Sequence, residues 1–409
     1  MFDAQSIQKD FPQLRRNIHG KRIVYLDSTA TSLKPTAVIR KEDDYYKRYT
    51  ANVFRGIYTT SEEATAEYER ARALTAAFIH AGSPEEIVFT RNTSESINLV
   101  AYSLLTHDLS PGDHIVTTIM EHHSNFVPWQ QLGAERNIAV DIWGITPQGT
   151  LNFADLEKLV TRKTKLLAVT AASNVLGTIN PVSKIVRAVK QLNPKCFVLV
   201  DAAQAVPHMP VDVAEWGADF VAFSSHKMLG PTGIGVLWGT QDVLDSLHPF
   251  LFGGEMISEV HVDRTVFKSA PHKFEAGTPH IAGVIGFGAA VEYLSALGMQ
   301  HVRDHEEKLV SYAMKQFDRM GGVTYLGPND ARIRGGVFAL QVKGAHPHDI
   351  AQLLNEDNVF VRAGNHCAMP LHESLGVPST ARASFYVYTT EKDIDALIVS
   401  LQKVKNMFG

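Results

Sequence analysis

The chain has 409 residues, of which 45% are hydrophobic and 20% charged, and these values exclude an intrinsically disordered or a collagen-like protein. The 39 basic and 43 acidic residues give a net charge of −4, so no overall basic field favours nucleic acid or a membrane surface. The two cysteines, Cys196 and Cys367, are too few for a disulfide framework or a cysteine-rich zinc site.

The sequence contains no recognisable targeting segment. The N-terminus is too polar for a signal peptide, and the longest uncharged apolar run, 281–291, is shorter than the length of about 18 residues that a membrane helix needs. Two thiols without a secretory context favour a reducing compartment, so we expect the protein in the cytoplasm.

Short β-branched runs alternate with helical patterns along most of the chain, which predicts βα units and a mostly parallel sheet. The expected strands are 86–90, 114–118, 165–171, 197–201 and 219–224, and the expected helices are 93–105, 125–136, 153–161 and 182–191. Residues 233–238 follow after too short a gap for a helical crossover, so we expect an antiparallel neighbour there. The polar stretch 253–272 interrupts the pattern and predicts a hairpin or loop.

The pattern changes after about residue 285 and predicts a smaller α+β domain. Its expected elements are helices at 283–297 and 305–320, a strand at 335–342, a helix at 347–356, strands at 359–362 and 382–388, and a helix at 391–407. We therefore expect a large domain over 21–285, a small C-terminal domain over 286–409, and an N-terminal segment, 1–20, that packs with the small domain.

Polar residues directly follow five of the expected strands. They are Arg91-Asn-Thr-Ser-Glu95, Glu121-His-His-Ser-Asn125, Ser173-Asn174, Asp201-Ala-Ala-Gln204 and Ser224-Ser-His-Lys227. Because ligands bind at the carboxyl ends of parallel strands, these five segments predict one shared site.

Asp201 and Lys227 are the two charged groups of this edge that most need an explanation. Asp201 ends an apolar strand, where a buried carboxylate needs a partner. It could be a helix cap or half of a buried ion pair. Alternatively, it could hold the protonated ring nitrogen of a pyridine cofactor. An isolated lysine is usually a solvated surface charge, but Lys227 lies between an apolar strand and a Gly-Pro turn. Burial there would lower its pKa, as an aldehyde-binding lysine requires. The flanking Ser224 and His226 could donate to a phosphate.

The segment 91–95, which follows the first expected strand, has two interpretations. The spacing of Asn92 and Glu95 predicts a helix cap, and the same helix start, with the hydroxyls of Thr93 and Ser94, could form an anion cup. The pair His122-His123 lacks the spacing of a zinc site, so a histidine that stacks on a flat ring is the favoured use.

The two cysteines differ in their surroundings. Cys196 begins an apolar strand and fits a buried structural residue, whereas Cys367 lies in a loop bounded by Gly364 and Pro370, beside His366, where a reactive thiolate is favoured. Arg382 starts a strand soon after and could clamp a substrate carboxylate, with a surface ion pair as the alternative.

Together these motifs resemble the class V aminotransferase family of pyridoxal phosphate (PLP) enzymes, and within it the SUF-type (group II) cysteine desulfurases. The resemblance covers nearly the whole chain, and its other specific motifs are Tyr25-Leu-Asp-Ser-Thr-Ala30, Ser173-Asn-Val-Leu-Gly-Thr178, Phe274-Glu-Ala-Gly-Thr-Pro279 and Arg362-Ala-Gly-Asn-His-Cys-Ala-Met-Pro370. It implies the fold of type I PLP enzymes, an α/β fold with a mostly parallel seven-stranded sheet in the large domain and a smaller α+β C-terminal domain.

The resemblance also implies roles for individual residues. Lys227 would carry PLP as a Schiff base, Asp201 would pair with the ring nitrogen, His122 would stack on the ring and Gln204 would bond the ring hydroxyl. Four side chains would bind the cofactor phosphate: Thr93, Ser94, Ser224 and His226. Three would bind the substrate, the first two at its carboxylate: Asn174, Arg382 and Arg362.

The implied reaction converts L-cysteine to L-alanine and leaves a persulfide on Cys367, with Cys367, Lys227 and His122 as the catalytic residues. Thr278 would reach the phosphate of the other subunit, which implies a homodimer. A SufE- or SufU-like acceptor protein would then collect the sulfur, for example for iron–sulfur cluster assembly.

Three positions differ from the usual pattern of the family. Phe54 and Tyr58 replace two histidines, the phosphate segment reads Arg91-Asn-Thr-Ser-Glu95 instead of Arg-Gly-Thr-Thr-Glu, and Asn365 replaces one of two histidines before Cys367, so that His366 alone would assist the thiol.

Two other functions remain open. A selenocysteine lyase or a cysteine-sulfinate desulfinase on the same scaffold needs no protein thiol, so L-selenocysteine is an alternative substrate. A non-catalytic scaffold is disfavoured, because both Lys227 and Asp201 are retained.

Overall fold

A sheet of seven strands forms the centre of the larger part of the protein in the computed structural model, which describes residues 2–408. From one edge to the other the strands are β4 (Ile87–Thr90), β10 (Gly235–Gly239), β9 (Phe220–Ser224), β8 (Phe197–Asp201), β7 (Thr164–Thr170), β5 (His114–Thr118) and β6 (Ala139–Trp143). Neighbours pair in parallel except at β10, which is antiparallel to β4 and β9. The predicted sheet and its antiparallel strand are therefore confirmed.

Helices cover both faces of this sheet, as its continuous apolar strands predict. They are α2 (Thr36–Arg48), α3 (Thr59–Phe78), α4 (Thr93–Ser103), α5 (Val127–Arg136), α6 (Leu156–Leu159), α7 (Val182–Leu192), α8 (Val213–Trp216), α9 (Gln241–Ser246) and α10 (Ile281–Leu297). Leu199 of β8 packs on one face with Val100 of α4 and Trp129 of α5, whereas Val200 packs on the other face with Val186 of α7.

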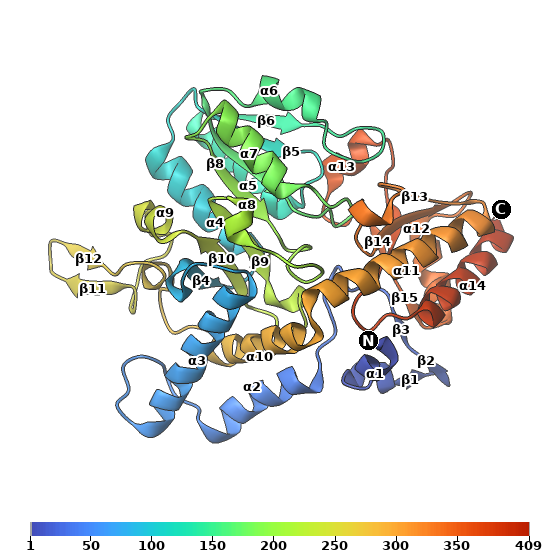
Figure 1. Cartoon of the computed structure of the whole chain (residues 1–409), viewed down its shortest axis with the longest axis horizontal. Helices are drawn as coiled ribbons and strands as arrows, with labels where there is room; N and C mark the ends of the chain where they lie inside the picture. Colours follow the sequence, from blue (N-terminus) through green and yellow to red (C-terminus); the bar gives the residue numbers. More distant parts are fainter. Residues whose placement is uncertain (1, 409) are drawn as a thin grey trace.

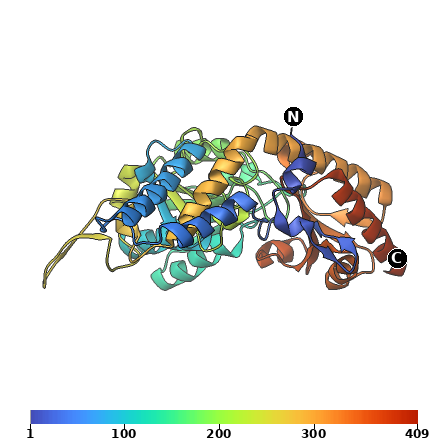
Figure 2. The same cartoon turned by 90° about the horizontal axis from the view of Figure 1, so that it is seen from below.

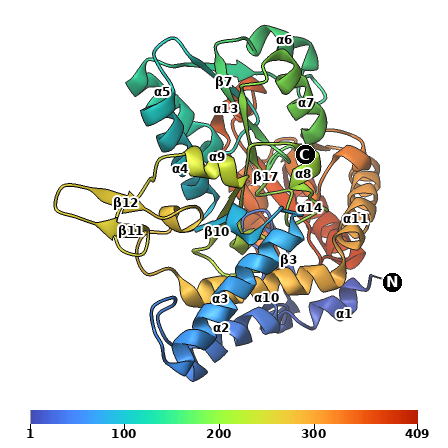
Figure 3. The ribbon, with the colours of Figure 1, turned by 60° about the vertical axis from the view of Figure 1, so that its left-hand side comes forward.

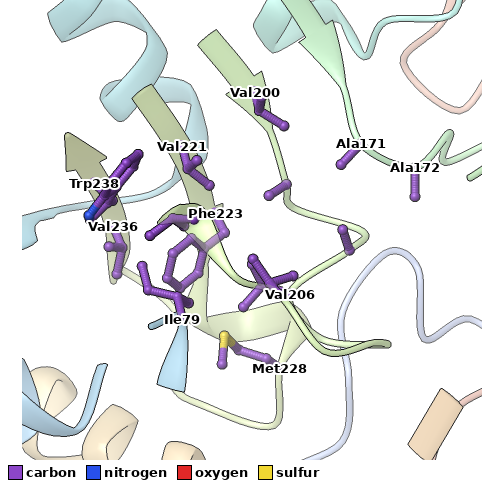
Figure 4. Close-up of a cluster of buried hydrophobic side chains, with 14 of the residues drawn as sticks. Ile79, Ala171, Ala172, Val200, Val206, Val221, Phe223, Met228, Val236 and Trp238 are labelled. Atoms are coloured by element: carbon purple, nitrogen blue, oxygen red, sulfur yellow. The ribbon is translucent and has the colours of Figure 1, made fainter. Parts of the chain in front are cut away.

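Figure 4 shows part of the second cluster. Val200, Val221, Phe223 and Val236 come from three neighbouring strands and lie together with Met228, and all five are fully buried. Burying a side chain of this size contributes about 1.5–3 kcal/mol, so this cluster holds β9 and the residues that follow it firmly in place.

Helix α10 packs along α2 and α3 on the outside of this cluster (Figure 3). Within residues 2–408 no single helix is long and apolar enough to cross a membrane. Among these described residues, only α10 and the helix that follows it, Met299–Met320, reach that length and composition when taken together, and they are bent by 72° relative to each other.

A second, antiparallel sheet lies in the C-terminal part, drawn in orange and red in Figure 1. Its strands, in spatial order, are β13 (Val323–Tyr325), β14 (Val337–Val342), β17 (Thr380–Ser384) and β16 (Arg362–Gly364). The helices of this part are α11 (Met299–Met320), α12 (Pro347–Glu356), α13 (Met369–Ser374) and α14 (Glu391–Phe408). Leu309 of α11, Ile350 of α12 and Leu401 of α14 form a common core with Leu340 of β14.

The N-terminal elements lie beside this C-terminal part (Figure 2). They are α1 (Ala4–Gln8), β1 (Asn17–Ile18), β2 (Lys21–Arg22) and β3 (Val24–Tyr25). Strand β3 pairs in parallel with β15 (Val359–Phe360), although the two are more than 300 residues apart in the chain. The predicted domain limits at 20/21 and 285/286 stay predictions, and the second falls inside α10.

Two predicted strands are wrong in extent. The strand expected at 359–362 is divided, because β15 joins β3 whereas β16 joins β17. The strand expected at 382–388 ends at Ser384, because the next apolar residues leave the sheet and contact the large part of the protein: Tyr386 donates to the Pro207 carbonyl at 2.9 Å, and Tyr388 accepts from the Leu33 N–H at 3.1 Å. The edge strands β6 and β13 and the helices α2 and α3 were not among the predicted elements.

A hairpin of β11 (Ile257–Val260) and β12 (Thr265–Phe267) projects from the body of the protein (Figures 1 and 2). The hairpin or loop expected at 253–272 is confirmed. It exposes Val260, Val262 and Val266 to solvent.

Candidate active site

The carboxyl ends of five parallel strands meet the turn after β16 at one cavity of about 280 Å³. This volume is close to the lower end of the range for small-molecule sites, about 300 Å³. Eleven of the predicted site residues line it: Thr93, Ser94, His122, Asn174, Asp201, Ser224, His226, Lys227, Arg362, Cys367 and Arg382. Two predicted residues, Gln204 and Thr278, do not line it.

Asp201 and Lys227 supply the two charges at the base of the cavity. Asp201 is the last residue of β8 and is 4% exposed, and within residues 2–408 the Ala203 N–H, at 2.9 Å, is the one hydrogen-bond donor to its carboxylate. Burial raises the pKa of Asp201, and the Ala203 N–H and Lys227 oppose this shift. Lys227 ends a short turn after β9, where burial lowers its pKa to about 8 against the attraction of Asp201. Near neutral pH the lysine is therefore partly uncharged and able to react as an amine.

The start of α4 closes one end of the cavity. The predicted cap is present, because Asn92 Oδ1 accepts from the Glu95 N–H at 3.0 Å. Glu95 Oε2 accepts from the Arg91 N–H at 2.7 Å, so the reciprocal bond reaches one residue further back than in a standard capping box. Gly235 in β10 gives this turn its room, since a Cβ there would lie 2.4 Å from the Asn92 carbonyl carbon.

Hydroxyl groups gather at this helix start. The Ser224 Oγ accepts from the Thr93 N–H at 2.8 Å and lies 2.5 Å from the Thr93 Oγ1, and the hydroxyls of Ser94 and Ser124 are 2.6 Å apart. Burial lowers the pKa of His226 beside them to about 4, so its ring is neutral. A helix N-terminus with several hydroxyl groups is well suited to bind a phosphate group.

His122 presents a neutral imidazole in the cavity wall. Its Nδ1 accepts from the Ser124 N–H at 3.1 Å, and burial, reinforced by the charge of Lys227, lowers its pKa to about 3. The ring therefore offers a flat, uncharged face.

Glu121 fastens the turn that carries His122, and sequence reasoning gave it no role. Its fully buried carboxylate accepts from the Thr118 hydroxyl at 2.6 Å, the Asn125 side-chain N–H at 2.7 Å and the Thr170 N–H at 2.8 Å. These bonds join the end of β5 to the end of β7. Burial raises the pKa of Glu121 to about 8 against these donors.

Two arginines, Arg362 and Arg382, form a positive wall of the same cavity. Arg382 of β17 is 3% exposed, donates from Nη1 to the Asn174 carbonyl at 3.0 Å, and burial lowers its pKa to about 10. Asp27 lies between them, 3.5 Å from Arg382 Nη2 and 3.4 Å from Arg362 Nε. The buried Arg382 Nε has no hydrogen-bond partner within residues 2–408. Asp27 was missed as a site residue, although it belongs to the motif Tyr25-Leu-Asp-Ser-Thr-Ala30.

Cys367 is an exposed free thiol in the wall of the same cavity, whereas Cys196 is fully buried and burial raises its pKa to about 12. The expected help from His366 finds no support. Its buried ring contacts the Thr380 hydroxyl through Nε2 at 2.9 Å, and burial holds its pKa far below the usual value. A neutral imidazole supplies no positive charge to a thiolate.

The two predicted residues outside the cavity have different positions. Gln204 is buried and donates from Nε2 to the Thr29 carbonyl at 2.9 Å, while its Oε1 lacks a partner within residues 2–408. Thr278 lines a second cavity of about 870 Å³, which shares Asn92 with the first and also contains Arg91. A single chain therefore does not bring Thr278 to Lys227.

The two aromatic residues that replace histidines lie away from the cavity. Phe54 packs edge-on against Tyr68 and His272, and Tyr58 is 56% exposed. Neither lines the cavity of Lys227.

Comparison with known proteins gives a consistent assignment. The model of the class V aminotransferase family matches residues 24–397. A probable cysteine desulfurase of Streptomyces coelicolor is 47% identical over 414 residues, which cover 100% of this chain and 99% of that protein. The apo structure of a cysteine desulfurase from Thermococcus onnurineus NA1 has a TM-score of 0.93 and 39% identity, with 98% of both chains covered. The cysteine desulfurase CsdA from Escherichia coli has a TM-score of 0.92 and 36% identity, with 100% of both chains covered.

Proposed function

We infer that this chain, which belongs to the class V aminotransferase family and within it to the cysteine desulfurases, converts L-cysteine to L-alanine and collects the sulfur as a persulfide on Cys367. The observation that carries this proposal is the exposed Cys367 thiol in the wall of the same cavity as Lys227 and Asp201. A lysine, a buried carboxylate and a thiol in one cavity are the groups that this reaction requires.

The groups around the cavity fit PLP as the cofactor. The buried Asp201 carboxylate has one donor in the described chain, so it can accept a further N–H, that of the pyridine ring. Lys227 would bind the aldehyde, and neutral His122 would cover the face of the ring. The phosphate would be held by polar side chains from two places: Thr93 and Ser94 at the start of α4, and Ser224 and His226 at the end of β9 and in the turn after it. When bound, PLP supplies an electron-withdrawing ring that stabilises negative charge on the substrate carbon atoms.

Gln204, which is buried and follows the cavity-lining Ala203, supports the same assignment. Its buried Oε1 lacks a partner in residues 2–408, which costs energy unless a ligand group or a rotated amide satisfies it. We assign Gln204 to the ring hydroxyl.

The arginine wall would receive the substrate carboxylate. The unpartnered Nε of Arg382 provides an N–H donor that a carboxylate can take, and the Arg362 guanidinium adds a second positive charge. Asn174 would complete this end, because it lines the same cavity.

Two residues of the chain carry the proton and the sulfur. The Lys227 amine takes the proton from the substrate Cα as a general base, which its lowered pKa favours. The Cys367 thiolate attacks the substrate sulfur, so that an S–S bond forms while the Cβ–S bond breaks. The bonding pair stays on Cβ, which takes up a proton and becomes a methyl group, and a proton returns from Lys227 to Cα to give L-alanine.

One assay tests this function against that of a selenocysteine lyase on the same scaffold. Alanine and sulfide or selenide release is measured from L-cysteine and from L-selenocysteine with wild-type protein, Cys367→Ala and the matched control Cys196→Ala. We expect Cys367→Ala to lose the reaction with L-cysteine and keep the one with L-selenocysteine, and Cys196→Ala to keep both. Sulfide release from L-cysteine at the wild-type rate by Cys367→Ala would remove the nucleophile from the mechanism.

The assignment to the SUF type and the need for an acceptor protein belong to the same proposal. Cys367 lies one residue before a buried alanine and two before the start of α13, so the segment that carries it is short. A persulfide on a short segment cannot travel far, which supports a SufE- or SufU-like acceptor that comes to the cavity. A thiol that must stay reduced to act also supports the cytoplasm as its compartment.

We propose a homodimer in which Thr278 serves the site of the partner. Its placement in a second cavity, and the exposed valines of the projecting hairpin, support this arrangement. Mixing Lys227→Ala protein with Thr278→Ala protein tests it, since a mixed dimer contains one site with both residues. Recovery of activity above that of either variant alone is the expected result, and its failure in subunits shown to exchange would refute the shared site.

A further inference from the structure

His123 joins the segment after β5 in the large sheet to the turn that carries Cys367. Its backbone N–H donates to the Cys367 carbonyl at 2.7 Å, and its side-chain Nε2 accepts from the Met369 N–H at 3.0 Å. One residue therefore contacts the chain at Cys367 itself and again two residues after it, although it lies more than 240 residues away in sequence. Nothing in the function proposed above uses this histidine.

The turn that His123 contacts is strained. His366 and Cys367 have φ values of 51° and 57°, two successive residues in the left-handed region that side chains with a Cβ disfavour. Such a conformation persists only where the surroundings hold it in place. Asn174 supplies another such bond, from its side-chain N–H to the His366 carbonyl at 2.7 Å.

The side-chain bond of His123 requires a particular state of the ring. Nε2 can accept an N–H only when it carries no proton, so the imidazole is neutral. Burial lowers the pKa of His123, which favours this state at neutral pH. The ring of His122, 6.3 Å away and also neutral, does not compete for the Met369 N–H.

We propose that His123 is a positioning residue that holds the strained Cys367 turn against the end of β5 and so keeps the thiol in the cavity of Lys227. Without the ring, the turn relaxes and the thiol samples the solvent more freely. The effect on persulfide formation rests on the proposed function, whereas the effect on the turn itself does not.

The test compares His123→Ala, His123→Gln and the control His301→Ala, which removes an exposed imidazole at the start of α11. Two rates are measured on the full-length protein: alkylation of Cys367 by iodoacetamide without substrate, and single-turnover formation of the Cys367 persulfide from L-cysteine with PLP bound. Loss of one hydrogen bond corresponds to a change of about fivefold.

We expect His123→Ala to raise the alkylation rate about fivefold and to lower the rate of persulfide formation at saturating L-cysteine by a similar factor. General loosening of the fold would expose the buried Cys196 to alkylation as well, so Cys196 must stay unlabelled in native His123→Ala. A glutamine side chain can present an oxygen to the Met369 N–H, so His123→Gln should return both rates toward wild type, and His301→Ala should match wild type.

Unchanged alkylation in His123→Ala, or His123→Gln as altered as His123→Ala, would overturn the proposal. If no variant forms a persulfide, the proposed function fails while the alkylation rates still decide the role of His123. If His123→Ala does not fold, hydrogen exchange of the Met369 amide in the wild type decides instead: protection supports the bond, and exchange at the rate of a free amide refutes it.

Discussion

Replacing Glu275 with glutamine tests the buried ion pair that anchors the loop of Thr278. Glu275 accepts from Arg72 Nη1 at 2.7 Å and Nη2 at 2.9 Å, and also from the Phe89 N–H at 2.7 Å. The side chains of Arg72 and Glu275 are only 2% and 6% exposed. The variant keeps the volume and an acceptor oxygen but removes the negative charge.

The expected loss of stability follows from this burial. Breaking a buried pair by removing one partner costs about 3–5 kcal/mol, because the buried Arg72 then keeps only the partly exposed Glu69 as an ionic partner. For a chain of 409 residues the unfolding entropy is about 0.9 kcal/mol/K, so Tm should fall by about 4–6 °C.

Thermal unfolding of both proteins at one protein concentration, with PLP in excess, measures this difference. The control is Asp43→Asn, which removes the charge from the exposed pair with Lys47, whose side chains are 50% and 69% exposed. An exposed pair contributes under about 1 kcal/mol, so the control should shift Tm by about 1 °C or less. A Glu275→Gln protein that melts within about 1 °C of wild type would refute the reasoning.

Three further predictions concern the site. Iodoacetamide should modify only Cys367 in the native protein and both cysteines after denaturation, because Cys196 is fully buried. Intact mass counts the modified thiols in each state. Labelling of Cys196 in the native protein would contradict its burial. Burial raises the pKa of Glu121 from 4.5 to about 8, so its protonated form stabilises the fold below about pH 4.5 and this contribution is lost as the pH rises through about 8. The Tm difference between Glu121→Gln and wild type should therefore shift in favour of the variant from pH 5 to pH 8.5, and a constant difference would be evidence against the shift. Lys34 donates to the His226 carbonyl at 3.0 Å, beside the lysine of the site, so Lys34→Met should weaken PLP binding about tenfold in a fluorescence titration, whereas unchanged affinity would exclude this role.

The strands and the groups at their ends could be predicted because the signals are local. An apolar run such as 197–200 predicts a buried strand, and the topology of parallel sheets then brings Asp201 and Lys227 to the same edge. Both residues line one cavity in the structure. The edge strand β6 gives a weaker signal, because four of its five residues are partly or fully exposed.

Contacts between distant residues left no such signal. Asp27 lies against Arg382, 355 residues further along the chain, and a carboxylate near the N-terminus predicts no arginine partner by itself. The division of 359–362 between two sheets has the same cause, because the partner of β15 is β3 at the other end of the chain.

The site takes its chemistry from two sheets that the chain builds separately. The parallel sheet supplies Lys227 and Asp201, whereas the smaller sheet supplies Arg382 and the turn of Cys367. The distance between the Lys227 amine and the Cys367 thiol is therefore not fixed within either sheet. It is fixed by contacts between the two sheets, and His123 makes two of these, at the Cys367 carbonyl and the Met369 N–H. A change of identity at Lys227 or Cys367 should remove a chemical step, while a change at His123 should keep every reacting group and alter only where the sulfur lies. The reacting groups can therefore be identified from the sequence, whereas the position of the sulfur relative to the amine depends on contacts that exist only in the folded chain.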